Sequence, residues 1–368
     1  MLIQVNRDLF LDSIQIVNRA VSNRTIVPSL AGILLEASSD RVRLTGNDLE
    51  ISITTEMSCR VFEPGEAVVP ARLLTETVRR SPEGNITLRA VAERNTIQLI
   101  NEPMQMEILT LAVDEFPETA SFDAEQSYII SQDMAKNMIR QVYFAISREE
   151  LRPILTGSLW SFEGSQLKMK ALDGYRLACR WASLSQAGND REVVVPGKTL
   201  RELMRLLSDQ DKELTVSIGR NFISFEFEGV VLTSRLLEGK FPNTDQFMPK
   251  AYQTRVVVNT EQLISSVERA ALVSKEGQDG SVKLTVEGDR LAVSAQSMDI
   301  GRHFEQLPVE KSGEDLQIMF NIKALVEMLS SAGSEEVALD FHGSFGPGVM
   351  RPVGQEEFTA LLMPVRLS

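Results

Sequence analysis

The sequence predicts an α+β protein of three homologous domains, each with two helices gathered on one side of antiparallel sheets. Three observations predict it. Short landmarks recur about every 125 residues, and each repeat contains two helical patterns of convincing length. The remaining runs alternate or are β-branched, as strands are. The 368 residues are enough for two or three ordinary domains.

The repeat is visible in landmarks that keep one spacing along the chain. Pro70 and Pro196, each preceded by valine and followed by a helical pattern, lie 126 residues apart, and Asn321 follows 125 residues later. The other landmarks at this spacing are Asp48, Asp173 and Met298, then Phe116 and Phe241. Because the segments 118–127 and 248–254 are polar and unpatterned, they read as linkers. We therefore predict domains at 1–121, 127–248 and 254–368.

Each repeat opens with a β-like run, an N-cap residue and a helical pattern. The N-cap candidates are Asn6, Ser131 and Asn259. The six predicted helices are 7–24, 71–81, 132–152, 197–208, 260–275 and 322–331. The clearest strand signals are 42–44, 51–55, 223–227 and 230–233.

The predicted helices separate apolar residues from charged ones. In the helix at 197–208 the apolar face consists of Leu200, Leu203 and Leu207. The opposite face carries Lys198, Arg201, Arg205 and Ser208. Such a stripe is usually a solvated surface, so one helix alone does not indicate a partner.

Charge is distributed unevenly between the helices and the rest of the chain. The six predicted helices carry net charges of +1, +2, +1, +2, 0 and 0 in chain order, a sum of +6. Because the net charge of the chain is −13, all other residues together carry −19. If the helices share one side of an assembly, that side attracts phosphate and the other side repels it.

Composition excludes several protein classes. The N-terminal stretch contains Arg7, Asp8 and Asp12, which a secretory signal does not tolerate, and no run reaches the ~18 apolar residues of a membrane span. Cys59 and Cys179 are too few for a disulfide scaffold or zinc cluster and are read as small core residues. We expect a cytoplasmic protein without metal or cofactor.

The chain resembles a known family over its whole length. The segments that carry the resemblance are 44–50 (LTGNDLE), 69–72 (VPAR), 114–117 (DEFP), 172–178 (LDGYRLA), 239–242 (GKFP) and 362–367 (LMPVRL). They resemble the bacterial beta sliding clamps, the beta subunits of DNA polymerase III. The resemblance implies the DNA-clamp fold and a head-to-tail homodimer closed into a ring, with helices lining the hole and sheets continuing outside across domain and subunit boundaries.

The resemblance implies a non-catalytic accessory subunit that encircles duplex DNA and tethers the polymerase, conferring processivity. Phosphate attraction without base readout suits a ring that slides on any sequence. The DNA-facing candidates are Arg24, Arg72, Arg148, Lys198, Arg201 and Arg205. Arg24 and Lys198 match family positions directly, whereas the other four rest more on the predicted helices.

The resemblance also implies a hydrophobic cleft that takes a short partner peptide. Its predicted residues are Arg152, Leu155, Leu172, Gly174, Tyr175, Arg176, Leu177, Pro242, Phe247, Met363, Pro364, Val365, Arg366 and Leu367. Without the family, Leu155, Leu172 and Leu177 would be read as core residues. The implied partners are the DNA polymerase III alpha subunit, other polymerases, the delta subunit of the clamp loader, and repair factors with clamp-binding motifs.

A subunit interface follows from the same resemblance. Its predicted residues are Leu73, Leu74, Val78, Met106 and Ile108 of the first domain against Leu272 and Val273 of the third. The chain departs from some relatives at Pro153, Gln246 and Ser368. We expect modest effects of all three departures on partner affinity.

The sequence gives little support to two other functions, an enzyme and a peptide-binding scaffold. For an enzyme, the sequence offers two histidines, His303 and His342, without metal-ligand spacing, and no phosphate-binding glycine loop or nucleophile elbow. Its adjacent carboxylates point in different directions and are read as solvated. For a peptide-binding scaffold that never encloses DNA, the charge asymmetry of the helices is the argument against.

Overall fold

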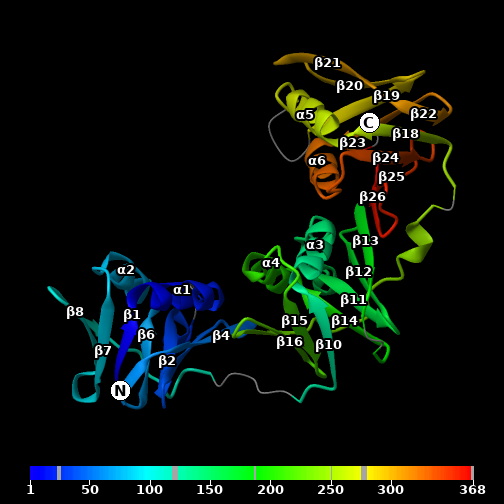
Figure 1. Cartoon of the computed structure of the whole chain (residues 1–368). Helices are drawn as coiled ribbons and strands as arrows, with labels where there is room; N and C mark the ends of the chain where they lie inside the picture. The colour runs from blue at the N-terminus through cyan, green and yellow to red at the C-terminus, as the bar shows by residue number, and fades with distance from the viewer. Residues whose placement is uncertain (23–25, 118–122, 186–187, 250, 275–279, 366–368) are drawn as a thin grey trace. The chain divides into compact units, whose positions relative to one another are not determined.

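The computed structural model describes residues 1–368 except 23–25, 118–122, 186–187, 250, 275–279 and 366–368 (Figure 1). The chain divides into two compact units. One consists of Met1–Gln132 with Arg205–Leu236, and the other of Asp133–Met204 with Leu237–Ser368.

The first unit is built on two antiparallel sheets. One has the order β5 (Arg60–Glu63), β1 (Leu2–Asn6), β7 (Asn85–Val91), β8 (Thr96–Asn101) and β9 (Met104–Leu109). The other has the order β10 (Gln126–Ser131), β15 (Glu213–Ile218), β16 (Phe222–Phe227), β17 (Val230–Arg235), β4 (Ile51–Ser58), β3 (Arg41–Asn47), β2 (Gly32–Ser38) and β6 (Gly65–Pro70). Because β17 pairs with β4, strands of the second repeat continue the sheet of the first.

Two helices pack on one side of these strands, α1 (Arg7–Val17) and α2 (Ala71–Arg80), and they contact each other (Figure 1). Phe10, Ile14 and Val17 of α1 are fully buried, as their spacing predicts. Leu74 and Val78 of α2 are buried in the same way. The core of this unit therefore lies between the helices and the sheets.

The second unit also contains two antiparallel sheets. The larger has the order β14 (Arg191–Pro196), β11 (Gly157–Glu163), β12 (Gln166–Leu172), β13 (Arg176–Ser183), β26 (Phe358–Leu362), β25 (Gly348–Pro352), β24 (Glu336–Phe341), β18 (Thr254–Asn259) and β22 (Glu310–Gly313). The smaller has the order β21 (Gly301–Pro308), β20 (Arg290–Ser297), β19 (Ser281–Glu287) and β23 (Leu316–Asn321). The β13–β26 pair joins the second repeat to the third, so the expected continuation of sheets across domain boundaries is confirmed.

Four helices complete the described elements of regular length: α3 (Gln132–Tyr143), α4 (Gly197–Leu206), α5 (Thr260–Ala271) and α6 (Ile322–Ser330). Helices α5 and α6 contact each other beside the strands of the third repeat (Figure 1). The predicted apolar face of α4 is confirmed, since Leu200 and Leu203 are fully buried and Leu207 just beyond it is 3% exposed. None of the described helices is long and apolar enough to cross a membrane.

Helix starts were predicted well because their caps are local. Asn6 accepts hydrogen bonds from the Asp8 and Leu9 amides at 3.0 and 3.2 Å, and Asn259 accepts one from Gln262 at 3.0 Å. These side chains satisfy amides that have no partner within the helix.

Three helix ends were predicted too far along the chain. Helix α1 ends at Val17 and tightens into a 3-10 turn, Asn18–Ala20, rather than reaching residue 24. Helix α3 ends at Tyr143 rather than 152, since the Ser147 amide donates to the Leu155 carbonyl at 2.9 Å and closes a loop. Helix α5 ends at Ala271 rather than 275.

The shorter helices change the charge count but not its sign. As observed, α1 to α6 carry −1, +2, +1, +2, −1 and 0, a sum of +3. Because the net charge of the chain is −13, the other residues together carry −16. The helices are therefore less basic than predicted, because Arg19 lies in the 3-10 turn after α1, and Arg24 and Lys275 lie outside the described residues. The net charge of α3 is unchanged, because Arg148 and Arg152 lie outside it together with Glu149 and Glu150. Both cysteines are free and half-buried rather than core residues.

Candidate functional site

Most of the predicted cleft residues lie around strands β12, β13 and β26 of the second unit. Leu172 pairs with Leu177 across the β12–β13 hairpin, and Leu177 pairs with Leu361 of β26. Two apolar clusters meet at Leu172, one containing Leu155 and Phe241 and the other containing Leu177 and Leu361. Leu155 and Leu177 are 4% and 0% exposed, so they form a floor and not a contact surface.

Exposed apolar side chains lie near these buried leucines in the chain, and we call them the rim. Tyr175 is 73% exposed, Phe247 45%, Met363 40% and Val365 43%. Large apolar side chains with this exposure are a common feature of surfaces that bind other proteins. Arg152 and Pro242 are also exposed, and Pro364 is half-buried, whereas Arg366 and Leu367 lie outside the described residues.

A hollow of about 740 Å³ lies beside these residues, between the 240–248 segment and one face of strands β11 to β13. Pro242 lines this hollow, but Leu155, Leu172, Tyr175 and Leu177 do not. Asp245 crosses the hollow's edge and forms an ion pair with Lys170 at 2.9 Å. The positive charge of Lys170 at this hollow is therefore neutralised by Asp245.

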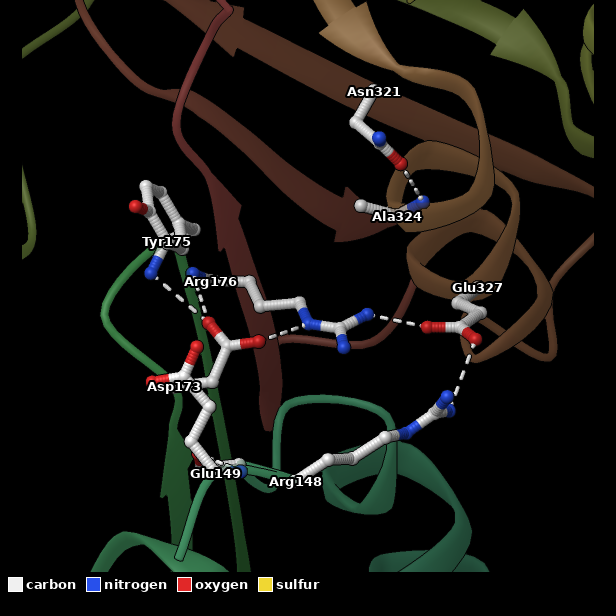
Figure 2. A network of polar contacts seen from close by, with 9 residues as sticks. Arg148, Glu149, Asp173, Tyr175, Arg176, Asn321, Ala324 and Glu327 are labelled. Atoms are coloured by element: carbon white, nitrogen blue, oxygen red, sulfur yellow. Dashed lines mark hydrogen bonds and ion pairs between the residues drawn. The ribbon is translucent and has the colours of Figure 1, made fainter. Parts of the chain in front are cut away.

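The turn that carries Tyr175 is held by Asp173. Its Oδ1 accepts hydrogen bonds from the backbone amides of Tyr175 and Arg176, both at 3.0 Å, and its Oδ2 accepts from Arg176 Nε at 2.6 Å (Figure 2). Gly174 between them has a φ of +98°, which a residue with a Cβ rarely adopts. The sequence therefore fixes the turn locally, and the turn presents Tyr175 to solvent.

Four charged side chains, Asp173, Arg176, Glu327 and Arg148, form a chain of contacts that we call the Glu327 network. Figure 2 shows Arg176 reaching from the turn to Glu327 of α6, while Arg148 approaches the other oxygen of Glu327. The Arg148 Nη2 to Glu327 Oε1 distance is 3.4 Å. Arg176 is 13% exposed and Arg148 is 71% exposed, so the two contacts differ greatly in burial.

The buried arginine remains charged. Burial acts to lower the pKa of Arg176, but its hydrogen bonds to Asp173 and Glu327 outweigh burial and raise the pKa above its ordinary value. Its guanidinium also lies 6.0 Å from the centre of the Phe144 ring.

The C-terminal segment is tied to both sides of this network. The Met363 amide donates to the Tyr175 carbonyl at 2.8 Å, and the Val365 amide donates to the Met319 carbonyl of β23 at 2.8 Å. Strand β23 ends at Asn321, which caps α6 by accepting from the Ala324 amide at 3.0 Å. The turn, the terminal segment and α6 are therefore mechanically connected.

The candidate DNA-facing residues differ in their surroundings. Arg72 on α2 and Arg201 and Arg205 on α4 are exposed, and Lys198 is half-buried. Arg148 was expected on a helix, but it lies in the loop after α3. Arg24 lies outside the described residues. Sequence reasoning missed the carboxylate of Glu327, for which no sequence motif gave a signal.

Of the predicted interface residues, three are core residues of the chain itself. Leu74 and Val78 are 0% exposed and Ile108 is 3% exposed, so their side chains pack inside this chain. Leu74 and Val78 lie one turn apart on the inward side of α2. The accessible members of the predicted set are Leu73, at 48% exposed, Leu272, at 77%, and the half-buried Met106 and Val273.

Among the described residues, no group of three or more His, Cys, Asp or Glu side chains could hold a metal ion. Pro153 begins a 3-10 turn, Pro153–Thr156. The Thr156 hydroxyl closes this turn by donating to the Pro153 carbonyl at 2.7 Å.

Comparisons with known proteins agree over the whole chain. Models of the N-terminal, central and C-terminal domains of the DNA polymerase III beta subunit match residues 1–120, 129–243 and 245–366. The beta sliding clamp of Bacillus subtilis is 33% identical over 374 residues, covering 98% of each chain, and that of Staphylococcus aureus is 29% identical over 371 residues with the same coverage.

Solved structures give the same result, each covering 100% of both chains. The DNA polymerase sliding clamp of Bacillus subtilis matches with a TM-score of 0.96 and 32% identity. The beta subunit from Streptococcus pyogenes matches with 0.94 and 31%, and a sliding clamp from Pseudomonas aeruginosa bound to griselimycin with 0.94 and 27%. The chain therefore belongs to the DNA polymerase III beta subunit family, the bacterial beta sliding clamps.

Proposed function

We propose that this protein is a sliding clamp: two copies close head to tail into a ring around duplex DNA and tether the replicative polymerase to it. The observation that carries the proposal is the match of all three successive beta-subunit domains. The role is non-catalytic, because holding a polymerase requires topology rather than a reaction. We place the clamp domains at 1–121, 127–248 and 254–368 and the protein in the cytoplasm, where bacterial DNA is replicated.

Contact with DNA is electrostatic and without sequence preference. The candidate residues are Arg24, Arg72, Arg148, Lys198, Arg201 and Arg205. The contrast between helices at +3 and the remainder at −16 supports a basic lining within an acidic protein. Exposed lysine and arginine attract phosphates through long-range charge, which salt weakens.

Partner proteins bind as short peptides over the floor and rim described above, which we call the peptide cleft. Support comes from the exposed Tyr175, Phe247, Met363 and Val365 over a buried leucine floor. A clamp from Pseudomonas aeruginosa has been solved bound to griselimycin, which shows that a relative binds a ligand. We propose the polymerase III alpha subunit, other polymerases, the loader's delta subunit and repair factors as occupants.

The subunit interface uses exposed residues on both sides. Leu73 and Met106 of the first repeat and Leu272 and Val273 of the third are the candidates that remain accessible. Strand β9, which carries Met106, lies at the end of its sheet and has an open edge. A second copy would cover this edge.

Retention on circular DNA is the decisive test. The clamp is loaded on nicked circular DNA by its loader, and retention is measured before and after the circle is cut. A ring stays on the circle and leaves through the cut ends. If cutting has no effect, the protein binds by surface contact and is a peptide-binding scaffold that does not enclose DNA.

Charge reversal tests the DNA contact. Replacing Lys198, Arg201 and Arg205 with Glu should shorten retention on DNA. A matched control reverses Arg89, Arg94 and Arg220, which are exposed and lie outside the α-helices. Equal lifetimes of both triple variants at low salt would remove α4 from the DNA-facing set.

Deletion of residues 363–368 tests the peptide cleft. The deleted clamp should lose binding of polymerase-derived peptides and still form a dimer by sedimentation. Unchanged peptide affinity would refute the assignment of the cleft.

A further inference from the structure

A cavity of about 450 Å³ lies on the helical side of the second unit. Residues from α3, the loop and the 3-10 turn after it, α4 and α6 line it. The charged lining residues are Arg140, Arg148, Lys198 and Glu327. The hydroxyl-bearing ones are Tyr143, Ser147, Thr156, Ser330 and Ser331.

The chemistry of this lining suits a phosphate group. Three cations face one carboxylate, and the hydroxyls of Tyr143, Ser147 and Ser330 add hydrogen-bond donors, whereas those of Thr156 and Ser331 already donate to backbone carbonyls. Helix α4 begins at the cavity with Gly197, where the first backbone amides of a helix favour negative charge. Arg140 forms no ion pair with a carboxylate among the residues that the structure describes, so its guanidinium fork is available to an anion.

The one carboxylate of the cavity is shared between two arginines. Glu327 holds the buried Arg176 through one oxygen and the exposed Arg148 through the other, at 3.4 Å. The contact to Arg148 is long and solvated, so it is the weaker of the two. An incoming phosphate therefore competes with Glu327 for Arg148 much more readily than for Arg176.

The other contact of Glu327, to Arg176, connects the cavity with the peptide cleft. Arg176 is joined through Asp173 to the turn that presents Tyr175, and the Tyr175 carbonyl accepts from the Met363 amide. When Arg148 turns to a phosphate, Glu327 interacts with Arg176 alone and holds this turn more firmly. A turn that is already ordered costs less conformational entropy when a peptide binds.

We propose that this cavity binds a phosphate of the DNA backbone, and that its occupancy strengthens peptide binding in the cleft through Glu327. The inference rests on the proposed function, because both DNA and peptide contacts belong to it. Solvated ion pairs such as Arg148–Glu327 shift an equilibrium by at most about fivefold. Loaded rings should therefore bind a cleft peptide roughly two- to fivefold more tightly than free rings. By linkage, the peptide should tighten DNA binding by the same factor.

The test compares free rings with rings loaded on nicked circular DNA and separated from the loader. The affinity of a fluorescent peptide with a Leu-Phe motif is measured by anisotropy for both. In the Glu327→Gln and Arg140→Gln variants, free and loaded rings should bind the peptide with equal affinity. Glu335→Gln, which removes an exposed carboxylate shortly after α6, should keep the full difference.

Two results overturn the inference while leaving the clamp function intact: equal peptide affinity of free and loaded wild-type rings, or a gain on loading that survives in Glu327→Gln. Rings that leave an intact circle, or that bind no peptide at all, would overturn the proposed function and the inference together. A parallel titration with inorganic phosphate on free rings identifies the source. No gain there supports a backbone phosphate, whereas a full gain overturns the assignment to DNA.

Discussion

The turn at Asp173 gives the sharpest prediction about peptide binding. Replacing Asp173 with Ala removes two hydrogen bonds from backbone amides and one from Arg176 Nε, at 3.0, 3.0 and 2.6 Å. Hydrogen bonds to a charged group contribute about 1.5–3 kcal/mol each when well shielded. The two amide bonds are partly solvated, so we expect the turn to lose about 2 kcal/mol in total. A peptide that must reorder the turn would then bind about 30-fold more weakly.

Asp173→Asn separates the two roles of the carboxylate. The amide oxygen can still accept from the backbone, but the Nδ2 group cannot accept from Arg176 Nε. We expect its affinity loss to be smaller, about fivefold, because only the contact to Arg176 is lost. Peptide affinity of each variant is measured by fluorescence anisotropy on the free dimer.

The first repeat supplies a matched control. Asp48 stands 125 residues earlier and accepts from the Glu50 and Ile51 amides, both at 3.0 Å. Asp48→Ala removes the same kind of turn from the other unit and should leave peptide affinity unchanged. If Asp173→Ala binds peptide within twofold of Asp48→Ala, the turn does not order the cleft and the reasoning fails.

Three further predictions concern stability, reactivity and assembly. Asp340 is 2% exposed and pairs with two arginines, so Asp340→Ala should lower the free energy of unfolding in urea by about 3 kcal/mol, and a loss below 1 kcal/mol would contradict this. Burial raises the pKa of the Cys179 thiol to about 11, so about one molecule in a thousand carries the thiolate at pH 8. Iodoacetamide should therefore label Cys179 slowly in the native protein and faster by about tenfold per pH unit, and complete labelling within minutes at pH 8 would argue against it. Leu73→Asp should shift the dimer to monomer in sedimentation without unfolding the chain, whereas the neighbouring Leu74→Ala should cost about 3 kcal/mol of folding stability. A Leu73→Asp dimer as tight as wild type would place the interface elsewhere.

Local sequence patterns were reliable where local physics decides. The apolar face of α4 was predicted correctly at Leu200, Leu203 and Leu207, because a period of 3.6 places those side chains together. The caps Asn6 and Asn259 were predicted because a short polar side chain reaches the amides that follow it. Helix ends were predicted poorly, since α1 and α3 stop where later parts of the chain return to them.

Burial of single residues could not be settled by the family resemblance. Leu73 and Leu74 are neighbours with similar side chains, yet one is 48% exposed and the other 0%. The difference depends on which side of α2 faces the sheets. The sequence of α2, in which leucines and charged residues are mixed, does not determine which leucine lies on that side. Val78 of α2 and Ile108 of β9 were assigned to the subunit interface by the resemblance, and both side chains are buried within this chain.

The sequence by itself determined that this protein repeats one α+β domain three times and that its helices together carry a net positive charge in an acidic chain. These features follow from periods, spacings and side-chain types that act within a few residues, or from repetition of the whole unit. Only the tertiary structure decided that Glu327, 151 residues from Arg176 along the chain, contacts that arginine with one carboxylate oxygen and Arg148 with the other. This ion pair forms only if the Glu327 side chain of α6 lies close to the turn between β12 and β13. The distance between α6 and that turn is set by packing across the sheets.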